Sequence, residues 1–353
     1  MSTPTKIAFL YSEIAGYTLA CFRELAKSAD ILLIKWPVNE EAPFEFDFPE
    51  NITVIDRKNY LVSDIQRELE EFKPQVIVCS GWMDKGYLKA INAYKENIPK
   101  IVCIDNHWVG NLKQRIASLI SPFYLKRIFS HAWVPGNPQK TFAEKLGFKK
   151  NILTGFYVAD TEKFNEVYSN HLIGKQQNFP KRFLYLARYV EHKGIFEMWN
   201  AFVEWQNETP NEWELWCVGT GDEWENRVKH EKIKHLGFKQ PDELADIIKE
   251  TGIYVLPSKF EPWGVSVQEF AVAGYPMIIS RAVGASTRFA STENSIIIEP
   301  GNIEELKLAF EAMANKSSEE LQEMACKSHE IGLQLTPQIW TKTLLNLLKE
   351  WKN

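Results

Sequence analysis

The stretch Ile253-Tyr-Val-Leu-Pro-Ser-Lys-Phe-Glu261-Pro-Trp-Gly-Val-Ser-Val-Gln-Glu269 joins three kinds of local pattern. Residues 253–256 are apolar, short and β-branched or aromatic, and they end at Pro-Ser, which predicts a buried strand. From Val265 the apolar spacing suits a helix with Glu269 near its start, so Glu261 falls in the intervening loop. A strand, a loop and a helix in this order predict one unit of a doubly wound α/β sheet.

The same unit recurs on both sides of this stretch. A chain of 353 residues exceeds what one core usually holds, so two domains are expected. Residues 165–180 are polar and lack clear periodicity, which predicts a linker. The sequence therefore predicts two Rossmann-like doubly wound domains, over 1–165 and 166–335. A C-terminal amphipathic helix over 336–353 could return to the first domain.

Composition restricts the class of protein. The net charge of −5 argues against a general nucleic-acid binder, which would need a strongly basic surface. The five cysteines are scattered and mostly lie in apolar runs, as buried residues of a reducing compartment do. No run reaches the ~18 apolar residues of a membrane span, and the first residues lack the apolar core of a signal peptide. We expect a cytoplasmic protein, at most peripheral to a membrane.

Charged residues gather in the loops where predicted strands end. A helix start offers free N–H groups to phosphate, and the carboxylates of Glu261 and Glu269 can accept from sugar hydroxyls. Arg188 and Lys193 follow the strand predicted over 182–187, and together they could hold a diphosphate. The alternative for this pair is an exposed basic loop. Gly219-Thr-Gly221 alone is more often a tight turn than a nucleotide site.

Taken together, these pieces resemble the C-terminal domain of the retaining GT-B glycosyltransferases of family 4. The family's hallmark is Glu-x7-Glu, which Glu261 and Glu269 match in spacing. Arg188 and Lys193 match its phosphate-binding pair, and Trp263-Gly264 stands at its aromatic-glycine position. The resemblance covers about residues 182–300.

The resemblance implies a role for each matching residue. Glu261 would contact the donor sugar, Glu269 the ribose, and Arg188 and Lys193 the diphosphate leaving group. The donor-binding residues that follow from it are Gly16, Arg188, Lys193, Gly219, Gly237, Phe238, Glu261, Trp263, Gly264, Val265 and Glu269. The base would lie near Gly237-Phe238. The arrangement requires neither a metal nor another cofactor, and no His/Cys cluster has metal-ligand spacing.

The first half resembles the family less closely. One glycine, Gly16, remains of the usual Gly-Gly loop after the first strand, and close approach of its backbone to phosphate is expected there. His107 follows the strand predicted over 101–104, near the position where relatives place a histidine facing the reacting sugar. Asp105 could equally fill that position, so both are catalytic candidates. The alternative for His107 is a hydrogen-bonded loop residue.

Residues 113–129 mix basic side chains with aromatic and aliphatic ones. Such a segment can lie on an anionic bilayer. The alternative is an ordinary core helix with exposed cations.

The resemblance thus implies a metal-independent hexosyltransferase. It would move a hexose-type sugar from a nucleotide-diphosphate donor to a hydroxyl of a glycan or lipid-linked acceptor, with retention, in cell-surface polysaccharide biosynthesis. The alternatives are a GT-B-like epimerase or phosphorylase, and a non-catalytic nucleotide-sugar-binding subunit.

Overall fold

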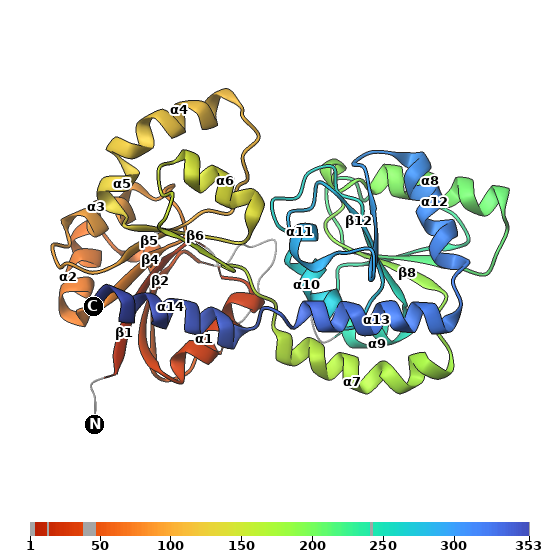
Figure 1. Cartoon of the computed structure of the whole chain (residues 1–353), viewed down its shortest axis with the longest axis horizontal. Coiled ribbons are helices and arrows are strands. Elements are labelled where there is room, and N and C mark those ends of the chain that lie inside the picture. Colours follow the sequence, from red (N-terminus) through yellow and green to blue (C-terminus); the bar gives the residue numbers. More distant parts are fainter. Residues whose placement is uncertain (1–3, 13, 38–46, 241–242, 353) are drawn as a thin grey trace. The chain divides into compact units, whose positions relative to one another are not determined.

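The structure is a computed structural model that describes all residues except 1–3, 13, 38–46, 241–242 and 353, and except the side chains of 171–174, 176 and 177. The chain divides into two compact units (Figure 1). Unit 1 contains residues 1–160 and 335–353, and unit 2 contains residues 161–334.

Unit 1 is built on a parallel sheet of seven strands in the order β3-β2-β1-β4-β5-β6-β7. The interior strand β1 is buried along Ile7–Tyr11, as expected where helices cover both faces of a parallel sheet. The strands are β1 (Thr5–Tyr11), β2 (Ala29–Lys35), β3 (Ile52–Asp56), β4 (Val76–Cys79), β5 (Lys100–Cys103), β6 (His131–Val134) and β7 (Ile152–Thr154).

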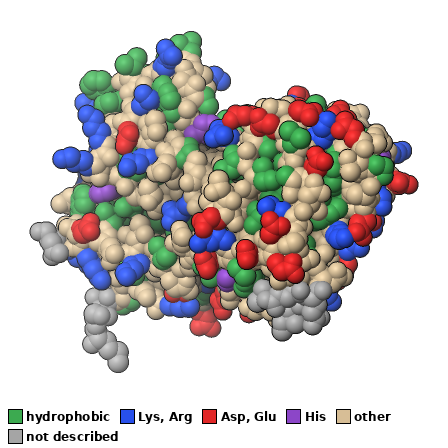
Figure 2. Space-filling model, turned by 45° about the vertical axis from the view of Figure 1, so that its right-hand side comes forward, with side chains coloured by type: hydrophobic (Ala, Val, Ile, Leu, Met, Phe, Trp, Pro, Cys, Tyr) green, Lys and Arg blue, Asp and Glu red, His purple; other side chains and the backbone are tan. Residues whose placement is uncertain are grey.

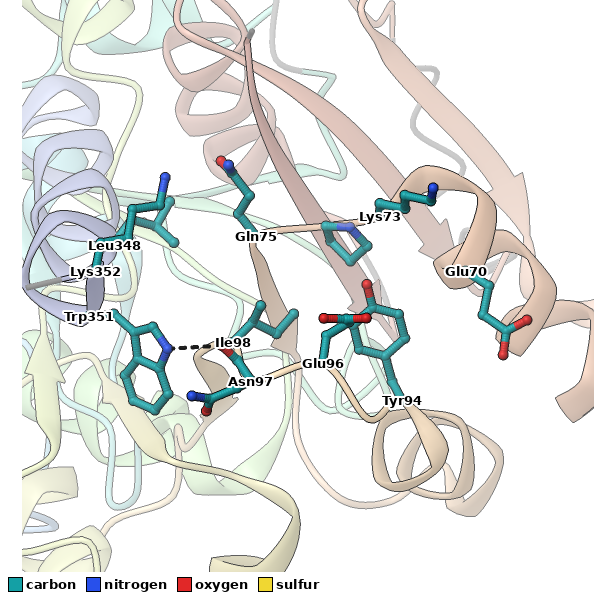
Figure 3. A pocket seen from close by; sticks show the side chains of 11 residues that line it. Glu70, Lys73, Gln75, Tyr94, Glu96, Asn97, Ile98, Leu348, Trp351 and Lys352 are labelled. Carbon is teal, nitrogen blue, oxygen red and sulfur yellow. Dashed lines mark hydrogen bonds between the residues drawn. The ribbon is translucent and has the colours of Figure 1, made fainter.

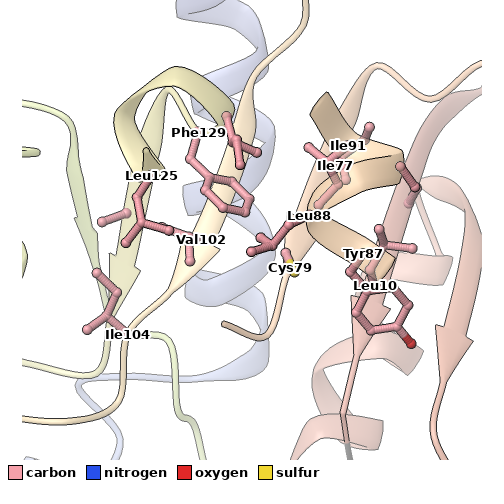
Figure 4. Close-up of a cluster of buried hydrophobic side chains, with 14 of the residues drawn as sticks. Leu10, Ile77, Cys79, Tyr87, Leu88, Ile91, Val102, Ile104, Leu125 and Phe129 are labelled. Atoms are coloured by element: carbon pink, nitrogen blue, oxygen red, sulfur yellow. The ribbon is translucent and has the colours of Figure 1, made fainter. Parts of the chain in front are cut away.

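Helices connect these strands and supply the other half of the core. Figure 4 shows part of this core, in which Leu88 and Ile91 meet Val102 of β5 and Ile77 of β4. The helices are α1 (Gly16–Ala26), η1 (Arg57–Asn59), α2 (Val62–Phe72), α3 (Lys85–Ala93), α4 (Leu112–Ile120), η2 (Ser121–Phe123), α5 (Leu125–Ile128), α6 (Asn137–Lys145) and α14 (Pro337–Lys352).

The C-terminal helix α14 belongs to unit 1, where it packs against α1. Trp340 is only 1% exposed, stacks on Trp133 at 4.8 Å between ring centroids, and donates to Phe156 O at 3.0 Å. A buried tryptophan of this kind contributes roughly 3–5 kcal/mol relative to alanine. The last helix is therefore part of the core of unit 1.

Unit 2 has a parallel sheet of six strands in the order β10-β9-β8-β11-β12-β13. Its strands are β8 (Arg182–Leu186), β9 (Glu214–Val218), β10 (Ile233–Gly237), β11 (Ile253–Leu256), β12 (Met277–Ser280) and β13 (Ser295–Ile298). Its helices are α7 (Thr161–Gln177), η3 (Glu191–Lys193), α8 (Ile195–Glu208), α9 (Leu244–Glu250), α10 (Val265–Val272), α11 (Ser286–Phe289), α12 (Ile303–Ala314) and α13 (Ser318–Gly332).

The two doubly wound sheets confirm the fold class expected from the sequence. One local prediction is wrong: most of the expected irregular linker over 165–180 is the helix α7. Its apolar residues are not concentrated on one face, so the sequence has little helical periodicity to detect. Among the described residues, no helix combines the length and the apolar character that a membrane crossing needs.

Candidate functional site

The carboxyl edge of the unit 2 sheet carries the residues singled out in the sequence. β10, β9, β8 and β11 are neighbours in this sheet, and all run parallel. Loops that follow adjacent parallel strands meet at one edge, which is where such folds bind ligands.

An ion pair joins two of these loops. Lys193, in η3 after β8, donates through Nζ to Glu261 Oε2, in the loop after β11. The two side chains are only 15% and 14% exposed, so water screens the pair less than it would at the surface. The structure thereby brings together a predicted phosphate-binding cation and a predicted sugar-binding carboxylate.

Gly194 makes this close approach possible. It has a left-handed backbone with φ of 71°, and a Cβ there would lie 2.3 Å from Pro257 O. No other residue type tolerates both the conformation and the contact without a shift of the backbone. Gly194 is also the N-cap of α8, so the first turn of this helix starts directly beside Lys193.

A second lysine holds the same two loops together. Lys259 Nζ lies 3.0 Å from Glu191 Oε1 and 3.0 Å from Glu197 Oε1, and its backbone N–H donates to His192 O at 2.8 Å. Burial favours the neutral amine, but the hydrogen bonds to Glu191 and Glu197 outweigh it and raise the pKa of Lys259. Lys259 therefore remains a cation that fastens the loop of Glu261 to the loop of Lys193.

Arg188 lies at the surface of this edge. Its guanidinium has no hydrogen-bond or ion-pair partner within the part of the chain that the structure describes, and its side chain is exposed. A cavity of about 530 Å³ opens there. It is lined by Arg188, Val190, Glu191, His192, Asp222, Glu223 and Lys259.

The glycine loop after β9 packs directly under Arg188. A Cβ at Gly219 would lie 2.1 Å from Ala187 O, so only glycine fits against the backbone of the β8 loop. Gly219 N also donates to Gly237 O at 2.8 Å, which links it to the end of β10. Phe238 follows at once and is 47% exposed, leaving an aromatic surface available to a ligand.

The loop of Glu261 leads into the start of α10. Gly284 N donates to Glu261 O at 3.0 Å, and Ala285 N donates to Trp263 O at 2.8 Å. Trp263 is 2% exposed and packs against Phe289, so its side chain anchors the loop. Gly264 is the N-cap of α10 and Val265 its first residue, which leaves the first N–H groups of the helix at this edge.

Glu269 projects from α10 and is partly exposed. The carboxylate of Glu269 lies close enough to the buried Tyr254 to affect the pKa of that phenol. Burial raises the pKa of Tyr254, and the negative charges of Glu269 and Glu261 raise it further. Tyr254 donates to Ser266 Oγ at 2.8 Å and so remains a neutral phenol beneath the carboxylates.

A partly buried polar pair supports the end of β10. Tyr189 Oη lies 2.9 Å from His235 Nδ1, and His235 Nε2 lies 2.8 Å from Val228 O. Burial lowers the pKa of His235, against the opposing effect of the bond to Val228, and the charge of Arg227 lowers it further. A neutral imidazole therefore ties the chain after β8 to β10 just before Gly237.

Unit 1 carries the remaining candidates at the carboxyl edge of its own sheet. Asp105 follows β5 and is exposed; Tyr157 donates to its Oδ2 at 3.2 Å. Tyr157 in turn meets Tyr17 edge-on at 5.6 Å between ring centroids. Gly16 is the first residue of α1 and directly precedes Tyr17. It therefore lies close in sequence to the group of side chains that contacts Asp105. Its φ is not positive and no atom lies within 4 Å of a Cβ built on it, so the backbone there is open.

His107 sits in a loop that one side chain holds in place. Gln114 Nε2 donates to His107 O at 2.7 Å, while Gln114 Oε1 accepts from Val109 N at 2.8 Å and Gly110 N at 3.0 Å. The loop is thereby fixed to α4.

A further cavity of about 450 Å³ lies at the opposite edge of the unit 1 sheet (Figure 3). Gln75 and Ile98 line it just before β4 and β5 begin, and Trp351 of α14 donates to Asn97 O at 3.1 Å beside it. It contains none of the predicted site residues. Among the described residues, no three His, Cys, Asp or Glu side chains are grouped as a metal site would require.

Two sets of contacts in these sites escaped the sequence interpretation. Lys259 lies within the quoted motif, but its partners Glu191 and Glu197 are 68 and 62 positions away. Tyr157 is 52 positions from Asp105. Because such pairings depend on the packed fold, only the topology could have suggested them.

Comparison with known proteins finds a family match in the second half of the chain. Residues 170–329 match the family model "Glycosyl transferases group 1". An uncharacterised glycosyltransferase of Methanocaldococcus jannaschii is 28% identical over 137 residues, which cover 36% of this chain and 34% of the relative. The 2-deoxystreptamine N-acetyl-D-glucosaminyltransferase of Niallia circulans is 27% identical over 142 residues, 37% of this chain and 34% of the relative. The matches thus span about a third of each relative.

Solved structures match over the whole chain. A glycosyltransferase from Rickettsia africae has a TM-score of 0.76 at 12% identity and covers 100% of both chains. Anabaena HepE, solved in complex with UDP, has a TM-score of 0.72 at 15% identity and covers 98% of this chain and 100% of its own. At these identities the likeness establishes the fold. Residues 170–329 thus match the glycosyl transferases group 1 family, and the two parallel sheets of the chain have the GT-B fold.

Proposed function

We propose that this protein transfers a hexose-type sugar from a nucleotide-diphosphate donor to a hydroxyl of a glycan or lipid-linked acceptor, with retention of anomeric configuration. The observation that carries the proposal is the pair of Lys193 and Glu261 beside the start of α10. A cation and free helix N–H groups suit a diphosphate, and a carboxylate beside them suits sugar hydroxyls.

The donor would lie along the carboxyl edge of unit 2. Lys193 and Arg188 would contact phosphate oxygens, and the N–H groups near Gly264 and Val265 would contact the same phosphate or the sugar. Glu261 would accept from sugar hydroxyls and Glu269 from the ribose. The exposed Phe238 would lie against the base, beside the backbone of Gly237.

The reaction breaks the bond between the anomeric carbon and the phosphate oxygen, whose electron pair stays on the diphosphate. Lys193 and Arg188 stabilise the charge that develops there. The acceptor oxygen forms the new bond on the same face, and its proton passes to a phosphate oxygen of the leaving group. No metal takes part in this scheme, and activity unchanged by EDTA is the corresponding expectation.

Asp105 and His107 are the two unit 1 candidates for the residue that contacts the reacting sugar. Asp105→Asn keeps the shape of the side chain and removes its charge, whereas His107→Ala removes a side chain from a loop that Gln114 still holds. Substituting the residue that contacts the sugar should lower kcat by at least about tenfold. This factor corresponds to the loss of one hydrogen bond of ~1.4 kcal/mol. Equal, unchanged kcat values would exclude both.

We place the enzyme in the cytoplasm or at the inner face of a membrane, in the assembly of cell-surface polysaccharide. Its five cysteines are unpaired, which fits a reducing compartment.

The experiment incubates the protein with UDP-, GDP- and ADP-sugars, with and without a panel of glycan and lipid-linked acceptors. UDP-glucose comes first because the similar Anabaena HepE has been solved in complex with UDP and glucose. Transfer that depends on an acceptor supports the proposal. Epimerised or phosphorolysed donor would point to the sugar-nucleotide alternatives, and binding without turnover to a non-catalytic subunit.

A further inference from the structure

Helix α4 presents an apolar face that the described part of the chain does not cover. None of its nine residues is buried. Leu112, Ile116, Leu119 and Ile120 of this helix, with Phe123 in the η2 turn that follows, are between 48% and 74% exposed. We call these five residues the α4 face.

The spacing of the α4 face gathers its side chains on one side. At roughly 100° per residue, positions 112, 116, 119 and 120 fall within an arc of roughly 100°. Ala117 lies on another side of the helix and packs against the unit 1 core, while Gln114 holds the loop before the helix. The small and polar residues of the helix therefore face unit 1, and its large apolar residues face outward. A helix that packs on a core has the opposite arrangement.

This arrangement separates the two interpretations of residues 113–129. Leu125 and Ile128 of α5 are buried, so the second half of the segment is core, as an ordinary helix would be. The first half, α4, touches the described core only through the partly buried Ala117 and has no buried residue. Single exposed apolar residues are common on proteins, whereas four on one side of a short helix, with a fifth in the turn that follows, indicate an interaction surface.

Cations flank the α4 face on both edges. By the same spacing, Lys113 lies just beyond one edge of the arc and Arg115 just beyond the other. Both are exposed, and Arg115 donates to Gly110 O at 2.8 Å, which keeps its guanidinium near the start of the helix. Arg127 is also exposed, and Lys126 lies over the ring of Phe148. Figure 2 shows apolar and basic side chains mingled at the top left, at the height of α4.

The segment around α4 is predominantly basic, although the chain as a whole carries −5. Between residues 109 and 150, Glu144 is the sole acidic residue against Lys113, Arg115, Lys126, Arg127, Lys140, Lys145, Lys149 and Lys150. A partner that complements this region is anionic and offers an apolar layer beneath its charges.

We propose that the α4 face docks on an anionic lipid bilayer. Its apolar side chains would enter the boundary between headgroups and acyl chains, while Lys113 and Arg115 extend sideways to lipid phosphates. Charge complementarity favours a bilayer, because cations on both edges of a convex apolar arc match a flat surface with phosphates all around. This inference concerns a surface apart from the donor site and does not depend on the proposed transfer reaction.

The test is flotation of the whole protein with vesicles, without donor or acceptor. One set contains phosphatidylglycerol with phosphatidylcholine, and the other phosphatidylcholine alone. An apolar variant carries Leu112→Ser, Leu119→Ser and Phe123→Ser; a charge variant carries Lys113→Glu and Arg127→Glu. Their matched controls, also at exposed sites, are Leu61→Ser with Leu308→Ser, and Lys229→Glu with Lys342→Glu.

We expect the parent and both controls to float with the anionic vesicles and to bind less in high salt. The charge variant should bind at least about tenfold more weakly, since each nearby cation contributes about 1 kcal/mol at an anionic surface. The apolar variant should bind at least about tenfold more weakly as well, because it loses three large side chains that would insert into the bilayer. Thermal melting of the variants should match that of the parent, because the changed side chains are exposed. A parent that stays unbound, that floats equally with phosphatidylcholine alone, or that is matched by either α4 variant would overturn the proposal. Donor binding, measured by calorimetry without vesicles, would be unaffected in all cases.

Discussion

Replacing Lys193 by alanine tests the ion pair at the centre of the proposed donor site. The lysine is only 15% exposed and Glu261 only 14%, so the change leaves a largely buried carboxylate without its cation. Leaving a buried polar group unsatisfied costs roughly 1–3 kcal/mol of folding free energy. Because Glu261 keeps some contact with water, we expect a cost within that range, smaller than the cost of breaking a fully buried ion pair. Unit 2 should therefore lose stability by this amount, which corresponds to a fall of roughly 2–10 °C in Tm.

The effect on turnover should be larger than the effect on stability. If Lys193 stabilises the departing diphosphate, its charge matters most in the transition state, and kcat should fall by about 10²- to 10³-fold. The dissociation constant of the donor should change less, because Arg188 and the start of α10 remain. Steady-state release of nucleoside diphosphate gives kcat, and calorimetry gives the dissociation constant.

Lys181→Ala is the matched control. Lys181 pairs with Glu212, but the two side chains are 52% and 70% exposed. Its loss should cost less than about 1 kcal/mol and leave turnover intact. If Lys193→Ala retained kcat within about threefold of the parent, a difference of well under 1 kcal/mol, the assigned role of Lys193 would be refuted.

Three further substitutions address binding, backbone and charge. Glu269→Ala should weaken donor binding by roughly tenfold or more, because charge-assisted hydrogen bonds to the ribose are lost, and it should change Tm little. Unchanged donor binding in calorimetry would contradict this role. Gly194→Ala should lower the free energy of unfolding by roughly 1–3 kcal/mol and reduce turnover. The reason is that the new Cβ would lie 2.3 Å from Pro257 O, at a residue with a left-handed backbone. A denaturation midpoint equal to that of the parent would count against this contact. Lys175 lies over Tyr275, and burial lowers its pKa to about 7, so the folded protein binds fewer protons than the unfolded one between about pH 7 and pH 10.5. Lys175→Met should therefore stabilise most below pH 7, with a gain that shrinks as pH rises; a gain that is the same from pH 6 to pH 10 would contradict the depressed pKa.

Much of the fold could be predicted because its strands are continuous apolar runs. β11, β12 and β4 are buried at every position, and each is marked in the sequence by a short apolar segment with a turn residue after it. α7 could not be predicted, since its apolar residues do not repeat at helical spacing. The position of α14 also depended on the packed structure, because an amphipathic pattern shows that a helix has a buried face and does not show which partner covers it.

The candidate site was predictable to the level of loops. The sequence places Lys193 and Glu261 after two different strands, and a doubly wound sheet brings such loops to one edge. The ion pair itself, the bracing by Lys259 and the bond from Tyr157 to Asp105 require the distances of the folded chain. For residues 113–129 the composition suggested either a membrane surface or a core helix, and only the burial of α5 and the exposure of α4 separate the two halves.

The most direct test of the account is a thermal-shift measurement with UDP, GDP and ADP and their sugars, on the parent and on Glu269→Ala. A ligand at 100 times its dissociation constant stabilises the folded state by about 2.7 kcal/mol, which corresponds to a rise in Tm of roughly 5–10 °C. The account predicts such a rise for at least one nucleoside diphosphate or its sugar in the parent and a much smaller one in Glu269→Ala. No shift with any of these ligands, or an equal shift in both proteins, would contradict it.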